Sequence, residues 1–313
     1  MEPNNMISKK TLSTDNLKGL SSGFDISSAT DYKSLLSNKT GHWYDTIRKL
    51  PQSFHALRYD PRVSYTIHAP NGFFDDPTGY RLLVSVHDSD RSASEYNNAF
   101  KVFADKNKLV VLSPLFPAGI SGDGFSDGYK VIQEKEIRYD LLLLKMIEEL
   151  QEASSYDFGK FYLFGFSGGG QFAHRFFYLH PDKLSAVSIG APGLITKLDM
   201  SRDWAFGTGD IEKKLGTALD LEQMSDVLVQ IIVGEEDLEE FIIPEKFKPL
   251  VEKLMGNTGK NRLERMKILK KNYENNGILP AFKIVPNVSH EGMKVVNDVQ
   301  DYFKSILISD KRF

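Results

Sequence analysis

Short runs of apolar residues recur along most of this chain, and helix-compatible segments lie between and after them. The runs predict strands at residues 63–68, 81–87, 109–113, 161–166, 184–190, 227–233 and 281–285. The other segments predict helices at residues 101–106, 137–150, 168–179, 261–275 and 291–308. Strands that alternate with helices form βαβ units, whose crossover helices cover both faces of a parallel sheet. The pattern therefore predicts the α/β class, with a mostly parallel sheet between two layers of helices.

Two parts of the chain interrupt this rhythm. Residues 1–37 are rich in Ser, Asn, Lys and Asp, which predicts a flexible or loosely packed leader, or alternatively a segment draped over the main domain. Residues 38–313 are then expected to form one domain. Within it, residues 195–226 are long and irregular for a crossover. An insertion over the carboxyl ends of the strands is where a lid or substrate-shaping cap would sit, although a passive surface excursion has the same pattern.

The most informative segment joins the strand at residues 161–166 to the helix at 168–179. The join reads G-x-S-x-G, with the serine at Ser167 and the glycines at Gly165 and Gly169. A sharp strand-to-helix turn strains the serine backbone and holds its hydroxyl clear of the sheet, and a side chain at either glycine would clash with neighbouring backbone. The helix N-terminus behind it offers N–H groups to a developing negative charge. Ser167 is therefore predicted to be a nucleophile, with a helix-capping serine as the alternative.

A serine hydroxyl needs a base that takes its proton and a third group that orients the base. After a G-x-S-x-G elbow, the acid and then the histidine follow the serine along the chain. His290 is the only histidine beyond the strand at residues 227–233, and it lies in a loop before the last helix, with a surface histidine as the alternative interpretation. The predicted acid is Asp237, which follows a glycine turn by three residues, and Glu235 and Glu236 are the alternatives.

The same chemistry requires an oxyanion hole made of backbone N–H groups. One donor is expected at Gly168, the residue after the nucleophile. The second is expected from the loop after the strand at residues 81–87, where Ser89 is the first candidate and Asp88 the second. Hydrolases usually carry glycine at the position of Asp88, because glycine lets the backbone approach the substrate, so the geometry of this loop is an open question. Arg91 either braces the loop, orients a polar substrate group, or is a solvated cation.

These residues together resemble a known superfamily. The chain is similar in layout to the α/β-hydrolase-fold serine hydrolases, in particular to the polyhydroxybutyrate-depolymerase-like and dienelactone-hydrolase-like esterases. The resemblance extends over about residues 63–308 and is carried by residues 87–89, 165–169, 190–193 and 234–237 and by His290. It implies an α/β-hydrolase fold with a Ser, Asp and His triad. It is weak evidence for any particular substrate, because hydrolases, lyases, peroxidases and inactive receptors share the fold.

Composition narrows the class of partner. The net charge of −3 gives no reason to expect nucleic acid or an anionic membrane as a partner. The absence of cysteine excludes a disulfide scaffold, a thiol nucleophile and cysteine-based metal sites. The sequence starts without an apolar signal segment and has no apolar run near the ~20 residues of a membrane span, so a cytoplasmic location is expected.

Several further residues are candidates for the pocket. Phe116 and Trp204 are expected near its mouth, where they would shape an apolar substrate site, although burial of Trp204 under the insertion is an equal alternative. Residues 119–128 resemble a phosphate-binding loop only loosely, and a flexible pocket rim is preferred. His174 is expected to be a helix-face or core histidine and not a second base.

The expected activity is hydrolysis of a small carboxylic ester or lactone through an acyl-enzyme intermediate. In this scheme Ser167 attacks the carbonyl, His290 transfers the proton, and Asp237 orients His290. No metal or organic cofactor is implied, and the sequence does not indicate an oligomeric state. The alternatives are a peptidase or amidase with the same triad, a non-catalytic ligand-binding protein of the same fold, and a relative that catalyses carbon–carbon cleavage or dehydration.

Overall fold

The computed structural model describes residues 40–122, 128–240 and 258–309. The chain divides into two units, Met1–Trp43 and Tyr44–Phe313, and the second of them contains the sheet and its covering helices. Helix α2 (Thr40–Lys49) lies across the boundary between them. The predicted leader at residues 1–37 lies outside the described residues and stays a prediction.

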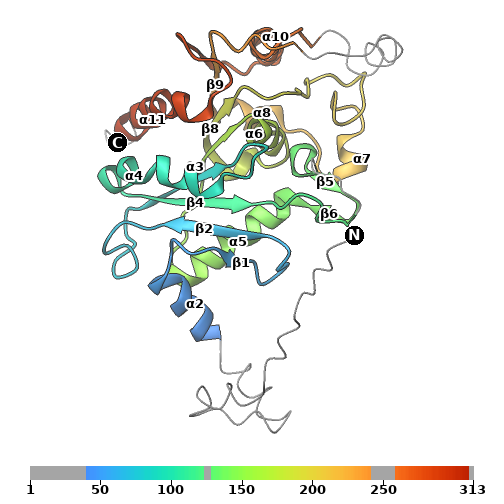
Figure 1. Ribbon diagram of the computed structural model, residues 1–313. Coiled ribbons are helices and arrows are strands. Elements are labelled where there is room, and N and C mark those ends of the chain that lie inside the picture. Colours follow the sequence, from blue (N-terminus) through green and yellow to red (C-terminus); the bar gives the residue numbers. More distant parts are fainter. Residues whose placement is uncertain (1–39, 123–127, 241–257, 310–313) are drawn as a thin grey trace, which may run out of the picture. The chain divides into compact units, whose positions relative to one another are not determined.

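The second unit is built on an eight-stranded sheet with the strand order β1-β2-β4-β3-β7-β8-β9-β10 (Figure 1). The six strands from β4 to β10 in this order are parallel to their neighbours, whereas β2 pairs antiparallel with β4 and with β1. The bounds are β1 His55–Ala56, β2 Ser64–His68, β3 Arg81–Val86, β4 Leu109–Leu115, β7 Phe161–Phe166, β8 Leu184–Gly190, β9 Leu228–Gly234 and β10 Ala281–Val285. The prediction of a mostly parallel sheet is confirmed.

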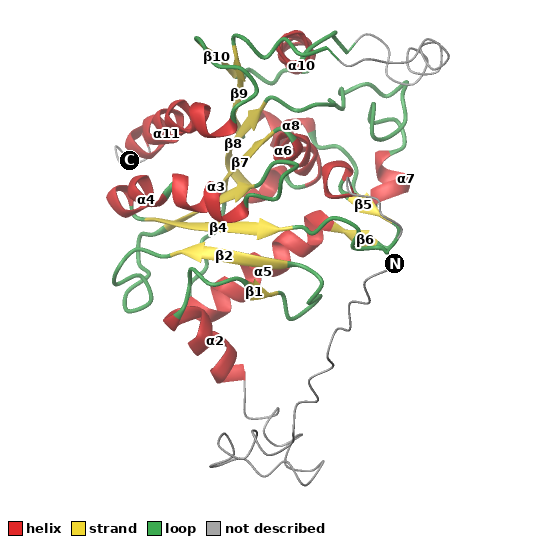
Figure 2. Ribbon diagram, in the orientation of Figure 1, coloured by secondary structure: helices red, strands yellow, loops and turns green. Residues whose placement is uncertain are grey.

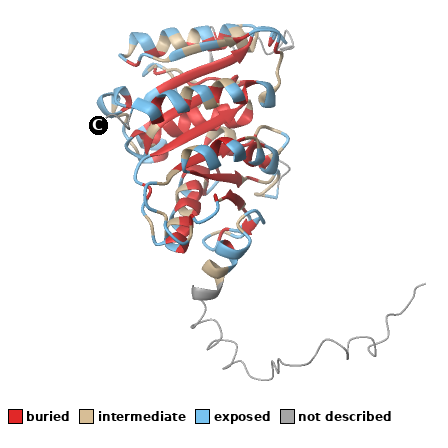
Figure 3. Cartoon of the chain, turned by 90° about the vertical axis from the view of Figure 1, so that its left-hand side faces the viewer, coloured by how far each residue is buried: buried red, intermediate tan, exposed pale blue. Residues whose placement is uncertain are grey.

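Helices cover both faces of this sheet (Figure 3). One layer contains α3 (Ala93–Ala99), α4 (Lys101–Asn107) and α11 (Gly292–Ser309), which contact one another. The other contains α5 (Tyr139–Ser154), α6 (Gly168–Leu179) and α10 (Arg262–Asn275); the Tyr273 ring of α10 packs against the rings of Phe177 and Tyr178 in α6. The interior strands are buried on both sides, which explains their continuous apolar runs in the sequence.

The short elements lie in the connections between the longer ones (Figure 2). They are the 3-10 turns η2 (Gly128–Val131) and η3 (Pro181–Lys183), the two-stranded pair β5 (Gln133–Glu134) and β6 (Ile137–Arg138), and the helices α7 (Ile211–Leu215) and α8 (Leu221–Ser225). The helix predicted at residues 137–150 begins two residues later, because Ile137 and Arg138 pair with Gln133 and Glu134. The predicted insertion at residues 195–226 holds α7 and α8 and connects β8 to β9.

Parallel strands point their carboxyl ends toward the same edge of the sheet. The chain leaves β3 just before Ser89, β7 just before Ser167, β9 shortly before Asp237 and β10 shortly before His290. The order of the strands therefore brings four segments that are far apart in the sequence to one edge.

Candidate active site

Ser167 occupies a tight turn between β7 and α6. Its backbone has φ 55° and ψ −111°, a left-handed conformation that costs energy for any residue with a Cβ. The Ser167 N–H donates to Gly190 O on the neighbouring strand at 2.8 Å, which ties the strained residue to the sheet. Because the surrounding backbone fixes this turn, the hydroxyl is held at the edge of the sheet and not within it.

The glycines of the turn allow close backbone contact. A Cβ at Gly165 would lie 2.1 Å from Gly169 O, and a Cβ at Gly169 would lie 2.3 Å from Val86 O. Both contacts are with backbone, which cannot rotate away as a side chain can. The structure thus gives the physical reason for glycine at these two positions of the G-x-S-x-G sequence.

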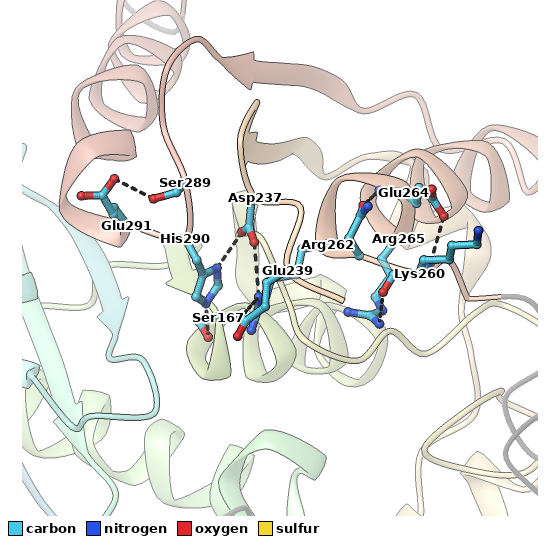
Figure 4. Close-up of polar contacts among 11 residues, drawn as sticks. Ser167, Asp237, Glu239, Lys260, Arg262, Glu264, Arg265, Ser289, His290 and Glu291 are labelled. Carbon is cyan, nitrogen blue, oxygen red and sulfur yellow. Dashed lines mark hydrogen bonds and ion pairs between the residues drawn. The ribbon is translucent and has the colours of Figure 1, made fainter. Parts of the chain in front are cut away.

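Ser167, His290 and Asp237 meet at this edge (Figure 4). His290 Nε2 lies 2.9 Å from Ser167 Oγ, and His290 Nδ1 lies 2.6 Å from Asp237 Oδ2. Asp237 is 1% exposed, whereas Glu235 and Glu236 are exposed and make no bond to the histidine ring. A carboxylate accepts, so Nδ1 donates to Asp237 and Nε2 is left to accept the serine proton. Of the three acids considered from the sequence, the structure places Asp237 against His290.

Backbone contacts between the loops after β9 and β10 hold the acid and the histidine together. Glu236 N–H donates to Val288 O at 2.8 Å, and Glu235 N–H donates to Val285 O at 2.9 Å. A Cβ at Gly234 would lie 2.2 Å from the same Val288 oxygen, so this approach requires glycine. The glycine turn that pointed to Asp237 in the sequence is therefore the place where the two loops touch.

Sequence reasoning missed Arg262, which also contacts Asp237. Its Nη1 lies 3.3 Å from Asp237 Oδ1 and 3.0 Å from Glu239 Oε2. Arg262 is the first residue of α10, after Asn261, whose side chain caps the helix by accepting from Glu264 N–H. A cation at the positive end of a helix is electrostatically unfavourable. That mismatch is the sequence signal that could have pointed to acidic partners for Arg262.

The predicted oxyanion donors lie next to each other. Gly168 N–H is the first of α6, where no intrahelical acceptor exists. A Cβ at Gly168 would lie 3.2 Å from Ser89 Oγ, so the loop after β3 packs directly on the start of α6. Within residues 40–122, 128–240 and 258–309, Ser89 N–H has no hydrogen-bond acceptor. Both N–H groups are therefore available to a bound oxygen atom.

Asp88 does not need to be glycine in this loop. It is not among the residues with positive φ, and the left-handed residue of the loop is Arg91, with φ 62°. The Asp88 carboxylate accepts from Tyr96 Oη at 3.2 Å and from Asp90 N–H at 3.0 Å. The Asp88 carbonyl accepts from Tyr129 Oη at 2.9 Å. These contacts hold the residue before Ser89 from both its side chain and its backbone.

Phe116 lies in the core and not at the mouth of a pocket. It is fully buried, and its ring packs against those of His87, Tyr129, Tyr139 and Phe172 at centroid distances of 5.3 to 6.0 Å. Its backbone N–H donates to His87 Nε2 at 3.0 Å. The aromatic residue after β4 thus lies in the core and contacts His87, the residue that follows β3.

His87 is a buried neutral histidine at the start of the loop after β3. Because Nε2 accepts from Phe116, Nδ1 carries the proton and donates to Asp88 O at 2.6 Å. Burial disfavours the charged ring and lowers the pKa of His87 from 6.5 to about 4. The unfolded chain therefore takes up a proton below pH 6.5 that the folded chain takes up only near pH 4.

This difference predicts that the protein loses stability as the pH falls. Between pH 6.5 and pH 4, His87 should lower the free energy of unfolding by about 3 kcal/mol, since the unfolded state binds the extra proton. His174 contributes in the same direction, because burial also lowers its pKa. Urea unfolding at pH 7 and pH 4.5 should show a smaller pH dependence in His87→Gln than in the wild type. An equal dependence in the two proteins would contradict the assignment to His87.

Arg91 braces the loop after β3. Its Nη1 donates to Ser89 O, and its guanidinium lies over the Tyr129 ring, 5.2 Å from the centroid. Of the three interpretations from the sequence, these contacts match the brace, because one partner is Ser89 itself and the other, Tyr129, donates to Asp88 O.

Trp204 lies in the insertion, where it is 7% exposed. Its Nε1 donates to Val131 O of η2 at 3.1 Å. It borders a cavity of about 430 Å³ that does not include Ser167. The other residues lining that cavity are Val131, Gln133, Lys135, Ala205 and Lys214. Trp204 therefore packs against η2, the segment that carries Tyr129.

The last two features considered from the sequence are His174 and the loop at residues 119–128. His174 is fully buried; its Nδ1 donates to Gly170 O at 2.9 Å, and its Nε2 accepts from Thr196 N–H at 3.0 Å. It is a core histidine, as expected. Residues 123–127 lie outside the described residues, so the interpretation of this loop as a pocket rim stays a prediction.

Among the described residues, no three acidic or histidine side chains come together in a way that could hold a metal ion. No helix in the same part of the chain is long and apolar enough to span a membrane.

Comparisons with known proteins bear on the fold. No family model matches the sequence, and no curated protein matches it. Among solved structures, the chain is similar to LpqC, a poly(3-hydroxybutyrate) depolymerase from Bordetella parapertussis, with 21% identity, coverage of 83% of this chain and 94% of that chain, and a TM-score of 0.64. It is also similar to poly(aspartic acid) hydrolase-1 from Sphingomonas sp. KT-1, with 19% identity, coverage of 76% and 91%, and a TM-score of 0.58.

A third similar structure is an S-formylglutathione hydrolase from Agrobacterium tumefaciens, with 14% identity, coverage of 82% of this chain and 93% of that chain, and a TM-score of 0.54. At such identities the likeness concerns the path of the backbone. The resemblance inferred from the sequence is confirmed at the level of the fold. The strand order and these similarities together show that this chain has the α/β-hydrolase fold.

Proposed function

We propose that this protein is a serine hydrolase that cleaves carboxylic esters or lactones of small molecules. The observation that carries the proposal is the continuous hydrogen-bonded path from Ser167 Oγ to His290 Nε2 at 2.9 Å and from His290 Nδ1 to Asp237 Oδ2 at 2.6 Å. A serine merely capping α6 would need no such path, and Ser167 makes no side-chain cap bond to the helix. The similar structures named as depolymerase and hydrolases support the same class of reaction.

The geometry fits a two-step acyl transfer. In the first step His290 Nε2 takes the proton from Ser167 Oγ, the oxygen attacks the substrate carbonyl, and the protonated histidine then gives the proton to the leaving alkoxide. Water, deprotonated by the same nitrogen, attacks the acyl-serine and releases the carboxylic acid. Asp237 holds the Nδ1–H tautomer through both steps and stabilises the imidazolium form.

The tetrahedral intermediates place negative charge on the former carbonyl oxygen. Gly168 N–H and Ser89 N–H are the proposed donors to that oxygen, since they lie side by side and neither is used within the described fold. The positive end of α6 adds to their effect. Asp88, held by Tyr96 and Tyr129, fixes the loop that presents Ser89 N–H.

A fluorophosphonate probe tests the proposal, because it phosphonylates only an activated serine. The wild type should be labelled on Ser167 and should hydrolyse at least one short acyl ester or lactone. Ser167→Ala should do neither. Ser89→Ala, a matched serine replacement that keeps its backbone N–H, should still be labelled. Absence of labelling and of hydrolysis in the wild type would refute the enzyme and favour a ligand-binding protein of the same fold.

The same residues are also suited to amide hydrolysis, so a second experiment compares the type of bond that is cleaved. Matched ester and amide substrates with one acyl group, together with a lactone panel, separate an esterase from an amidase. Oligomeric esters belong in the same panel, because one similar structure is named as a poly(3-hydroxybutyrate) depolymerase. We expect the highest kcat/KM with small esters or lactones.

A further inference from the structure

Arg262 and Glu239 form a charged pair, and Arg262 also contacts Asp237 (Figure 4). Asp237 is an acid with two oxygens in different surroundings: Oδ2 faces His290 at 2.6 Å, and Oδ1 faces Arg262 Nη1 at 3.3 Å. The same Nη1 lies 3.0 Å from Glu239 Oε2. One guanidinium nitrogen therefore bridges the acid of the proposed triad and a second acid two residues further along the loop.

Burial differs strongly along this row of charges. The Asp237 side chain is 0% exposed, that of Arg262 is 12% exposed, and that of Glu239 is 77% exposed. A buried carboxylate oxygen without a donor would be costly, and Arg262 supplies a charged donor to it. Glu239 partly neutralises Arg262 from the solvent side. The row thus runs from water to the histidine as Glu239, Arg262, Asp237 and His290.

We propose that Arg262 is a positioning residue of the proposed triad: it orients the Asp237 carboxylate toward His290, and the Arg262–Glu239 pair sets how strongly that carboxylate stabilises a protonated His290. This inference rests on the proposed function for its catalytic meaning. Arg262 and a protonated His290 would be two cations beside the one Asp237 carboxylate. The charge of Arg262 therefore favours the neutral ring, which can act as a base. Glu239 limits this effect.

Other charged groups also lie on the elements packed around His290, and most have their own partners. Glu291, next in the chain, accepts from Ser289 Oγ and forms an ion pair with Lys294 at 2.8 Å. The Asp88 carboxylate accepts from Tyr96 Oη and Asp90 N–H. Further charged groups on neighbouring elements are Arg91 of the oxyanion loop, which donates to Ser89 O, Arg265 of α10, which donates to Lys260 O, and Lys130 of η2. Arg262 is the cation with a direct contact to the acid that binds His290.

Two substitutions should move the acid limb of the pH–rate profile in opposite directions. Arg262→Gln removes the competing cation, so the protonated ring persists to higher pH, and the limb should move up by about one pH unit. Glu239→Gln leaves Arg262 uncompensated, so the limb should move down by less than about half a unit, because Glu239 is largely in water. Arg262→Lys, which keeps the charge and loses the planar fork, should keep the limb near its wild-type position.

Each variant has a matched control that changes the charge by the same amount. Lys267→Gln removes an exposed cation from the same helix, and Glu240→Gln removes the neighbouring exposed acid; neither residue makes a hydrogen bond or ion pair within the described part of the chain. Both controls should leave the profile unchanged. At the pH optimum, Arg262→Gln should lower kcat about tenfold with KM within about twofold, since misorientation of the acid affects the reaction and not substrate binding.

The test separates this inference from the proposed function. Titration of the His290 ring by NMR in a Ser167→Ala background needs no turnover, and its midpoint should move in the same two directions in Arg262→Gln and Glu239→Gln. Opposite movements support the inference even if the wild type hydrolyses no ester. Movement in the same direction, or an Arg262→Gln profile equal to that of Lys267→Gln, would overturn it. A lower melting temperature without any movement of the midpoint would reduce Arg262 to a structural ion pair and also overturn it.

Discussion

Replacing Asp237 by Asn should lower kcat/KM for a cleaved ester by about 10⁴-fold, with little change in KM. The aspartate accepts from His290 Nδ1 at 2.6 Å and so keeps Nε2 free to accept the Ser167 proton. An asparagine can turn its NH₂ toward the ring, which favours the tautomer with the proton on Nε2. That tautomer cannot take a proton from the serine, so the attack loses its base. Steady-state kinetics on the best ester of the panel measures the effect.

Glu236→Gln is the matched control for this substitution. Glu236 is exposed and contributes its backbone N–H to Val288 O, a contact that the glutamine keeps. It should retain kcat/KM within about twofold, as expected for a surface residue without a partner at the site. A fall of several orders of magnitude in Glu236→Gln together with a small effect in Asp237→Asn would transfer the role of the acid to Glu236.

The parts of the fold that the sequence predicted best are those with strong local signals. The bounds of β7, α6, β8 and β10 agree with the predicted segments residue for residue. Their apolar runs end at glycine or proline where the chain turns, as at Gly190, the last residue of β8, and at Pro181 after α6. Strand β1 was missed, because two residues do not establish a period. Helix α3 was missed because its sequence, ASEYNNA, holds few apolar residues.

In the candidate site, too, the residues with a strong local signal were predicted and the others were not. Ser167, Asp237 and His290 could be found because each follows a predicted strand and their order along the chain is informative. The contact of Arg262 with Asp237 joins residues 25 positions apart, and the local pattern, a cation at the start of a helix, does not indicate which acid it contacts. The position of Phe116 was also out of reach, since a residue after a strand faces either the pocket or the core, depending on the packing of four other rings.

The second large effect is expected from a substitution of Gly169, in the turn that carries Ser167. In Gly169→Ala the new Cβ would lie 2.3 Å from Val86 O and 2.7 Å from His87 O, where real side chains are not found. Either α6 or the end of β3 must move. We expect the free energy of unfolding to fall by about 4 kcal/mol, and the folded fraction to lose about 100-fold in kcat/KM, because the loop that carries Ser89 starts at His87. Urea unfolding and ester kinetics measure the two effects.

Gly168→Ala is the informative comparison, since it adds the same methyl group one residue earlier. There the nearest atoms belong to side chains, Tyr129 Oη at 2.2 Å, Lys130 Cε at 3.0 Å and Ser89 Oγ at 3.2 Å, which can move. Displacing the Tyr129 hydroxyl removes one of the two donors to the Asp88 carbonyl and leaves His87 Nδ1, so Gly168→Ala should lower kcat/KM while costing less than about 2 kcal/mol of stability. Equal destabilisation by the two substitutions would mean that the backbone contact at Gly169 is not what requires glycine in this turn. A large loss of stability in Gly169→Ala alone would mean that glycine is required because α6 crosses the end of β3 at this residue. The proposed nucleophile and the oxyanion loop meet at the same crossing.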